Sequence, residues 1–275
     1  MALKDLLVIV DDTPQAAARI AVAASLAARH EAHLTGLYIR PLLTIPRFVE
    51  MEMPEEIRER SHRYLVERVT EAQTLFEETA HRYGCNGRAE WRVAEGAAAE
   101  VAAIHGHYAD LIVVGQRDAS HDMLDPEDLL FSSGRPLLVV PAAGTFATVG
   151  ERVILAWNAS REAARAAHDG LAVLETARKV TVLAINPPRG RHGMGDEPGA
   201  DIARHLSRHG VVAEAQQVVS DALDPGALLL NAVADSGADL VVMGAYGRSR
   251  LRELVLGGMT HYVLSHMTVP VLMSH

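Results

Sequence analysis

The sequence predicts an α/β protein built from two tandem domains, each with a parallel sheet. Apolar runs that read as buried strands alternate with alanine-rich segments that read as helices along the whole chain. This order occurs twice, and residues 109–115 and 238–244 (ADLIVVG and ADLVVMG) are nearly identical. Alternation of strand and helix predicts parallel strands, right-handed crossovers and helices on both faces of each sheet.

Each copy of the repeat contains five expected strands. In the first copy they are residues 6–10, 32–38, 89–93, 109–115 and 135–141. In the second copy they are residues 153–157, 179–185, 213–219, 238–244 and 269–273. Expected helices between them include residues 54–83, 96–108 and 224–236. We expect Thr13 and Ser160 to cap the first helix of each copy, because a hydroxyl can accept from free helix N–H groups.

The domain boundary is expected in a linker of small residues, residues 142–150. The predicted domains are therefore residues 1–142 and 150–275. A length of 275 residues is enough for two ordinary domains, and a hydrophobic content of 49% supports a core in each.

Composition excludes several classes of protein. The net charge of −9 argues against a nucleic-acid-binding surface, which needs clustered Lys and Arg. We find no apolar run long enough for a membrane span and no leader segment, so we expect no membrane span and a cytoplasmic location. The single cysteine, Cys85, excludes an internal disulfide and any zinc site with several cysteines.

The strongest candidate site follows the fourth strand of the second copy. Gly244 and Gly247 follow this strand, and Gly257 and Gly258 precede a helix that begins near Met259. Glycine lets backbone N–H groups approach an anion, and a helix N-terminus adds free N–H donors and partial positive charge. This arrangement indicates a phosphate site; the alternative is that the glycines only shape a turn.

The spacing is neither that of the dinucleotide fingerprint nor that of the P-loop. It resembles the G-x2-G-x9-G-[ST] signature of ATP-binding universal stress proteins, read here as Gly244-x2-Gly247-x9-Gly257. Gly258 stands where that family has Ser or Thr. The missing hydroxyl predicts weaker phosphate binding, because one side-chain donor is lost.

The resemblance covers essentially the whole chain, as two universal stress protein domains in tandem. It implies an adenine nucleotide α-hydrolase-like fold, a five-stranded parallel sheet in each domain with strand order 3-2-1-4-5. It also implies that the last strands of the two domains pair, so that the chain forms an internal pseudo-dimer. Two such chains could associate further as a homodimer, as many members of the family do.

The resemblance predicts different roles for the two copies. The first copy keeps the acid at the end of its first strand, Asp11, which in the family contacts the adenine side of ATP. Asp118 replaces its second glycine, and four more acids follow (Asp122, Asp125, Glu127 and Asp128), so phosphate would be repelled. We interpret the first copy as degenerate for ATP. A metal site of these acids with His121 is the less favoured alternative, because the spacing fits no ligand pattern.

The second copy keeps the glycines but has Asn158 at the position of the acid, and an amide can still donate and accept hydrogen bonds. The resemblance, carried over position by position, predicts a site for ATP, alone or with Mg²⁺. Arg248 is either a partner for phosphate or an exposed charge. The predicted binding residues are Asn158, Ile185, Met243, Gly244, Gly247, Arg248, Gly257, Gly258, Met259 and Thr260.

We predict no catalytic and no metal-binding residues. His205 and His209 have the i, i+4 spacing of metal ligands, but no Glu accompanies them as in H-E-x-x-H. Two further segments lie near the expected strand ends: residues 41–60, a partly apolar flap, and residues 187–199, a Gly- and Pro-rich loop. The loop carries Arg189, Arg191 and His192, which could close over phosphates or simply face solvent.

Three functions are compatible with these patterns. The favoured one is a stress-response or regulatory protein that binds ATP in its C-terminal domain. The second is an interaction protein, or a binder of a small ligand or lipid, that uses no nucleotide. The third is a slow ATP hydrolase, which ranks last because no general base stands beside the glycines.

Overall fold

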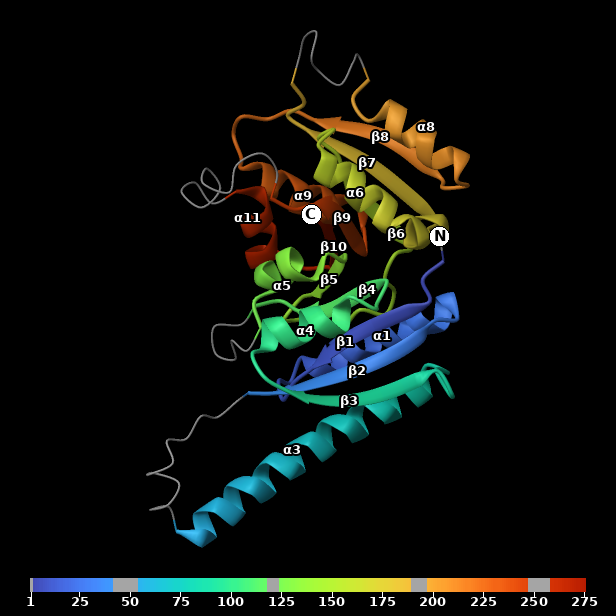
Figure 1. Ribbon diagram of the computed structural model, residues 1–275. Helices are drawn as coiled ribbons and strands as arrows, with labels where there is room; N and C mark the ends of the chain where they lie inside the picture. Colours follow the sequence, from blue (N-terminus) through green and yellow to red (C-terminus); the bar gives the residue numbers. More distant parts are fainter. Residues whose placement is uncertain (1, 42–53, 118–123, 189–196, 247–257) are drawn as a thin grey trace.

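The computed structural model describes residues 2–41, 54–117, 124–188, 197–246 and 258–275. Ten strands form one sheet in the order β3-β2-β1-β4-β5-β10-β9-β6-β7-β8, with helices on both faces (Figure 1). The N-terminal strands are β1 (Asp5–Val10), β2 (His33–Arg40), β3 (Ala89–Glu95), β4 (Leu111–Gly115) and β5 (Leu137–Val140). The C-terminal strands are β6 (Arg152–Ala156), β7 (Lys179–Ile185), β8 (Ala213–Val218), β9 (Leu240–Gly244) and β10 (Val271–Ser274).

Each half of this sheet has the strand order 3-2-1-4-5, as the resemblance implied. Strand pairs within each half are parallel, and the two halves meet through β5 and β10, which run antiparallel with Leu138 opposite Leu272. The internal pseudo-dimer is therefore confirmed. The two five-stranded sheets are joined into one continuous sheet, since the edge strand of each half completes the hydrogen bonding of the other.

The helices form one layer on each face of the sheet. One layer contains α1 (Ala16–His30), α3 (Glu55–Arg82), α6 (Arg161–Asp169), α7 (Leu171–Glu175) and α8 (Ala200–Arg208). The other contains α4 (Ala98–Gly106), α5 (Pro126–Ser133), α9 (Pro225–Ser236) and α11 (Met259–His266). Alternate residues of the strands point to opposite faces, so in β1 Leu6 and Val8 join the first core and Leu7 and Ile9 join the second. Both cores run through both halves.

The first helices of the two halves begin differently. Ser160 caps α6 as predicted, since its hydroxyl accepts from the N–H of Ala163 at 3.1 Å. The same prediction for Thr13 is wrong: the N-cap of α1 is Gln15, which makes no side-chain cap. The hydroxyl of Thr13 instead donates to Oδ1 of Asp11 at 2.5 Å. When the two copies are aligned on Asp11 and Asn158, α1 therefore begins two residues later than α6. The later start leaves more space at the carboxyl end of β1.

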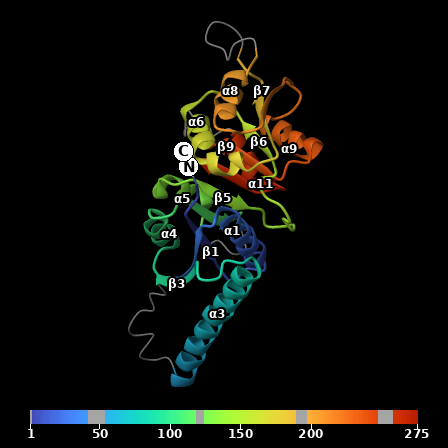
Figure 2. The same cartoon turned by 90° about the vertical axis from the view of Figure 1, so that its right-hand side faces the viewer.

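Helix α3 extends far beyond the sheet. It is 28 residues long, and its buried side chains, Ala72, Phe76, Thr79 and Ala80, all lie in its C-terminal half. In both views the other end projects away from the body of the protein (Figures 1 and 2). The projecting half exposes Ile57, Tyr64 and Val66, each about half accessible. Most of residues 41–60, the expected flap, lie outside the described residues.

No helix in the described ranges is both long enough and apolar enough to cross a bilayer. The longest, α3, carries charged residues along its whole length.

Candidate functional site

The carboxyl ends of the central C-terminal strands bring several predicted site residues to one edge of the sheet. Ala156 at the end of β6 lies opposite both Leu183 of β7 and Met243 of β9. Asn158, Ile185 and Gly244 follow these positions by one or two residues and therefore share that edge. Met243 itself is buried, so it contributes to the core behind the edge.

Asn158 occupies the structural position of Asp11. Its Oδ1 accepts from the N–H of Ser160 at 3.0 Å, and Oδ1 of Asp11 accepts from the N–H of Thr13 at 3.0 Å. In both halves this short side chain closes the turn that leads out of the first strand. The repeat alignment at this position is confirmed, and the side chain of Asn158 remains exposed.

Gly244 is needed for packing. A Cβ at this position would lie 2.4 Å from the backbone N of Ala163 and 2.4 Å from the backbone C of Glu162. The first turn of α6 therefore rests directly on the end of β9, and only glycine leaves room for it. This contact explains the glycine without a ligand.

A buried carboxylate lies beside this contact. Glu162 is 5% exposed, and its Oε1 lies 2.5 Å from Nε of Arg161. Burial raises the pKa of the Glu162 carboxyl, but hydrogen bonds from Arg161, from its own backbone N–H and from Ser160 outweigh burial and leave the pKa lowered. Glu162 thus holds a negative charge at neutral pH, and the guanidinium of Arg161 compensates it.

The start of α11 provides the opposite electrostatics. Gly258 is its N-cap, with φ −60° and ψ 167°, and no side chain caps the helix. The free N–H groups of the first turn and the helix dipole favour an anion there. Thr260 in this turn is buried, and its Oγ1 accepts from the N–H of Tyr246 at 3.4 Å, which ties the start of α11 to the loop after β9. Met259 is only partly exposed.

Several predicted residues lie outside the described residues. These are Gly247, Arg248 and Gly257 of the glycine loop, Arg189, Arg191 and His192 of the preceding loop, and Asp118, His121 and Asp122 of the N-terminal half.

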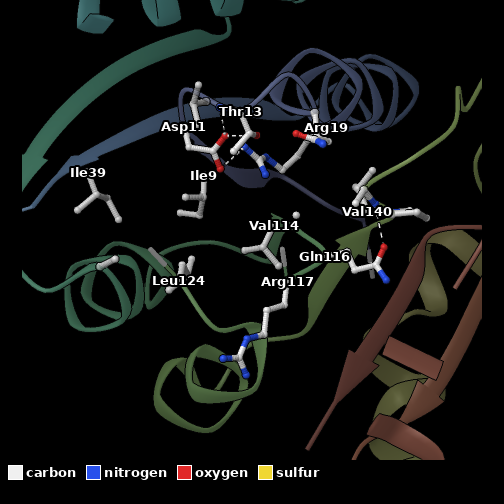
Figure 3. A pocket seen from close by; sticks show the side chains of 16 residues that line it. Ile9, Asp11, Thr13, Arg19, Ile39, Val114, Gln116, Arg117, Leu124 and Val140 are labelled. Carbon is white, nitrogen blue, oxygen red and sulfur yellow. Dashed lines mark hydrogen bonds and ion pairs between the residues drawn. The ribbon is translucent and has the colours of Figure 1, made fainter. Parts of the chain in front are cut away.

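The structure shows a well-defined pocket in the N-terminal half, at the carboxyl ends of β1, β4 and β5 (Figure 3). Its volume is about 60 Å³. Apolar side chains such as Ile9, Ile39 and Val114 form part of its lining. The polar lining residues are Asp11, Thr13, Gln15, Arg19, Gln116 and Arg117.

An ion pair forms part of the polar lining. Nη2 of Arg19 lies 2.7 Å from Oδ2 of Asp11, and Arg19 is 4% exposed (Figure 3). A Cβ on Gly115 would lie 2.3 Å from Nη1 of Arg19, so the guanidinium fills the space next to this glycine. The sequence analysis missed Arg19. The available signal was the repeat itself, because the position that corresponds to Arg19 in the second copy is Ala166.

The neighbouring acid, Asp12, is bound elsewhere. Its Oδ1 and Oδ2 accept from the hydroxyl of Tyr38 at 2.9 and 3.0 Å. Burial, and then the hydrogen bond to Asp12, raise the pKa of Tyr38, so the phenol keeps its proton and remains a donor. Of the two adjacent acids, only Asp11 lines the pocket.

The wall of the pocket also contacts the C-terminal half. Nε2 of Gln116 donates to the carbonyl of Leu264 in α11 at 2.7 Å, and its Oε1 accepts from the N–H of Ala142 at 2.9 Å. On the same side, the ring of Phe131 in α5 lies 5.2 Å from that of Tyr246 and 4.7 Å from that of His275. The N-terminal pocket and the helix of the predicted phosphate site are thus joined by direct contacts.

Comparison with known proteins gives the family of this chain. The model of the universal stress protein family matches residues 2–131 and again residues 151–275. The chain belongs to the universal stress protein family. Its two matched segments make it a tandem universal stress protein, each segment containing one half of the sheet. A search of curated proteins found no match.

Solved structures share the tandem fold. A universal stress protein from Archaeoglobus fulgidus DSM 4304 aligns with 98% of this chain and 97% of its own, at 16% identity and a TM-score of 0.71. A structure from Pseudomonas aeruginosa UCBPP-PA14 aligns with 99% of this chain and 93% of its own, at 16% identity and a TM-score of 0.58. These identities establish the fold of this universal stress protein and nothing about its ligands.

A universal stress protein solved in complex with cAMP aligns with 52% of this chain and 100% of its own, at 17% identity and a TM-score of 0.39. That likeness is too weak to carry an argument about this site. Among the described residues of this universal stress protein, no three His, Cys, Asp or Glu side chains are arranged to hold a metal ion.

Proposed function

We propose that this universal stress protein binds an adenine nucleotide, ATP in the first instance, in its C-terminal domain. The observation that carries the proposal is the start of α11: Gly258 leaves the helix without a side-chain cap at the edge where β9 ends. Free N–H donors at a helix N-terminus favour phosphate oxygens. The glycine spacing that precedes α11 in the sequence supports the same ligand.

The affinity is expected to be modest. Gly258 gives no side-chain donor, and the carboxylate of Glu162 beside Gly244 is engaged by Arg161, so neither residue attracts a phosphate. Magnesium would neutralise part of the triphosphate charge, because Mg²⁺ is commonly held by phosphates and waters with few protein ligands. We therefore propose that binding is stronger with Mg²⁺ than without it.

The proposed role is regulatory and does not include turnover. Helix α11 accepts a hydrogen bond from Gln116 through the carbonyl of Leu264, and Tyr246 packs on Phe131 of α5. A nucleotide that orders the start of α11 would therefore act on contacts between the two halves. Occupancy of the site would change the surface that the protein offers to a partner.

Calorimetric titration with ATP, with and without Mg²⁺, tests the proposal. The wild-type chain should bind close to one nucleotide per chain. Gly258→Ser restores the hydroxyl that the family signature contains, and the backbone of Gly258, with φ −60°, accepts a serine without strain. It should bind at least about tenfold more tightly, since a hydrogen bond to a charged group contributes roughly 1.5–3 kcal/mol.

Gly247→Asp gives the opposite change, because it copies Asp118 of the N-terminal half and places a carboxylate in the glycine loop. It should abolish binding. Absence of binding in the wild type and in Gly258→Ser would contradict the proposal. Equal binding in the wild type and in Gly247→Asp would show that the nucleotide binds at another site.

A second function, an interaction protein that uses no nucleotide, is favoured by one observation. The projecting half of α3 exposes Ile57, Tyr64 and Val66 without burying them against the described residues. Large exposed apolar side chains grouped on one element are typical of surfaces that bind partners. Mass spectrometry of molecules released on denaturation distinguishes the two functions. A released nucleotide supports nucleotide binding. No released nucleotide, together with titrations that show no ATP binding, supports an interaction protein.

A further inference from the structure

The pocket of the N-terminal half lies at the position that corresponds to the proposed nucleotide site of the C-terminal half. Three pairs of residues define the correspondence: Asp11 and Asn158, Ile39 and Ile185, and Gly115 and Gly244. Asp11, Ile39 and Gly115 all line the N-terminal pocket. What fills this pocket therefore decides whether the chain has one such site or two.

We propose that Arg19 fills the N-terminal pocket from within and so excludes an adenine nucleoside from it. Its guanidinium takes the space beside Gly115, where a Cβ would come within 2.3 Å of Nη1. In the C-terminal half the equivalent space beside Gly244 is covered by the backbone of α6, and Ala166 replaces the arginine. The later start of α1 leaves the room that the guanidinium occupies.

Arg19 also engages the carboxylate that a ligand would need. Oδ2 of Asp11 pairs with Nη2 of Arg19 at 2.7 Å, and Oδ1 is taken by the backbone N–H and the hydroxyl of Thr13. Both oxygens of Asp11 are therefore engaged. The remaining pocket, about 60 Å³, is far below the roughly 300–1,000 Å³ of ordinary ligand sites.

The hydrogen bonding of Arg19 indicates that its place in the pocket is not fully satisfied. Among the described residues its Nε has no hydrogen-bond acceptor, and Nη2 is close to Asp11 but not oriented for a hydrogen bond. Oε1 of Gln15, the N-cap of α1, is also buried with no donor in the part of the chain that the structure describes. Buried polar groups without partners destabilise the state that contains them. Removal of this side chain is therefore expected to open the pocket, although it breaks the ion pair with Asp11.

The test is a titration with adenosine, which lacks phosphates and so avoids repulsion by the acids from Asp118 onward. It is done in the Gly247→Asp background, and the parent chain with Arg19 unchanged measures any adenosine that the C-terminal half binds. This choice of probe rests on the proposed function, but the result does not depend on it, because only binding in excess of the parent chain is assigned to the N-terminal pocket. Arg19→Ala empties the space beside Gly115. Arg19→Met is the matched control, since it removes the charge and keeps most of the volume.

We expect Arg19→Ala to bind close to one adenosine per chain more than Arg19→Met or the parent chain, saturably and in the millimolar range or tighter. Arg19→Ser is the second small variant, should Arg19→Ala not fold; folding is checked by circular dichroism. A folded small variant that does not bind adenosine would overturn the proposal. So would equal binding by Arg19→Met, because charge rather than volume would then be the barrier.

Discussion

Gly115 and Gly244 hold equivalent positions in the two halves, but their neighbours differ in stiffness. The backbone of α6 stands against Gly244, whereas the end of the Arg19 side chain stands against Gly115. A helix backbone cannot move without moving the helix, while an arginine can rotate away. Glycine is thus required at position 244. At position 115 a larger residue fits if the side chain of Arg19 moves away.

This difference leads to a paired prediction. Gly244→Ala should lower the free energy of unfolding by about 1–3 kcal/mol, the usual cost of an overpacked core. Gly115→Ala should lower it less, because only the guanidinium must shift. Urea denaturation of both variants measures the difference, and a larger loss for Gly115→Ala would contradict the packing argument.

For single residues, the sequence predicted which positions of the two copies correspond better than it predicted which side chains touch. The repeat placed Asp11 opposite Asn158, and both close the same turn. It could not place Arg19, because the direction of a long side chain depends on where its helix begins. The roles of Gly244 and Gly258 as ligands remain predictions, since Gly244 is already explained by α6.

Among the helices, α6 and α8 share a group of three histidines. The ring of His205 lies 5.3 Å from that of His168 and 4.9 Å from that of His209. Burial, and then the positive charges that His168, His209 and Arg208 would carry, lower the pKa of His205. The spacing of His205 and His209 was visible in the sequence, but the contribution of His168 required the fold.

The lowered pKa predicts an acid-sensitive contact. An unfolded histidine binds a proton near its ordinary pKa of about 6.5, whereas folded His205 binds one only at lower pH. His205 therefore does not change the free energy of unfolding at high pH. It lowers this free energy as the pH falls through the pKa of the unfolded histidine. His205→Gln should reduce the loss of stability between neutral and mildly acidic pH, measured by urea denaturation across that range. An unchanged pH profile would contradict this prediction.

Helix α3 combines an anchored half with a projecting half. Phe76 is 1% exposed and its ring lies 5.5 Å from that of Trp91. Phe76→Ala should lower the free energy of unfolding by about 3–5 kcal/mol. Ser61→Pro should change it little, because the turns before it are not packed on the described residues, while helicity by circular dichroism should decrease. A comparable loss of stability from both variants would show that the projecting half is anchored too.

The strands were predicted to within a few residues. The inner strands lie between two helical layers and are mostly apolar, whereas the outer strands β3 and β8 are largely exposed. Helix starts were less predictable. Thr13 looked like a cap by residue type, but Asp11 two residues before it takes its hydroxyl. Such local competition between side chains is decided by geometry that residue types do not encode.

For the whole molecule the decisive contact is the pairing of β5 with β10. Leu138 and Leu272 are opposite each other, both buried, and both belong to the core that runs through the two halves. The family resemblance predicted this pairing. Its physical basis is that an unpaired edge strand exposes a row of backbone donors and acceptors. The bridge of Gln116 to Leu264 was not predictable, because it depends on the angle between the halves.

A double-mutant cycle tests how strongly the two halves depend on each other. Leu138→Ala and Leu272→Ala should each lower the free energy of unfolding by about 2–5 kcal/mol. Their effects should not add, and the coupling should be of the order of 0.5–3 kcal/mol, because the side chains meet across the strand pair. Guanidinium denaturation of the four proteins gives the value. Strict additivity would mean that the two side chains do not interact across the strand pair.

The covalent link between the two halves, residues 141–151 between β5 and β6, has a consequence for how the protein can diverge. In a dimer of identical chains each substitution occurs on both sides of the symmetry axis, and dilution separates the sides. Here the halves stay together at any dilution, and a change in one is not copied in the other. Arg19 can therefore occupy the pocket of the N-terminal half while Ala166 stands at the equivalent position of the C-terminal half. The two halves keep the same fold but present different surfaces.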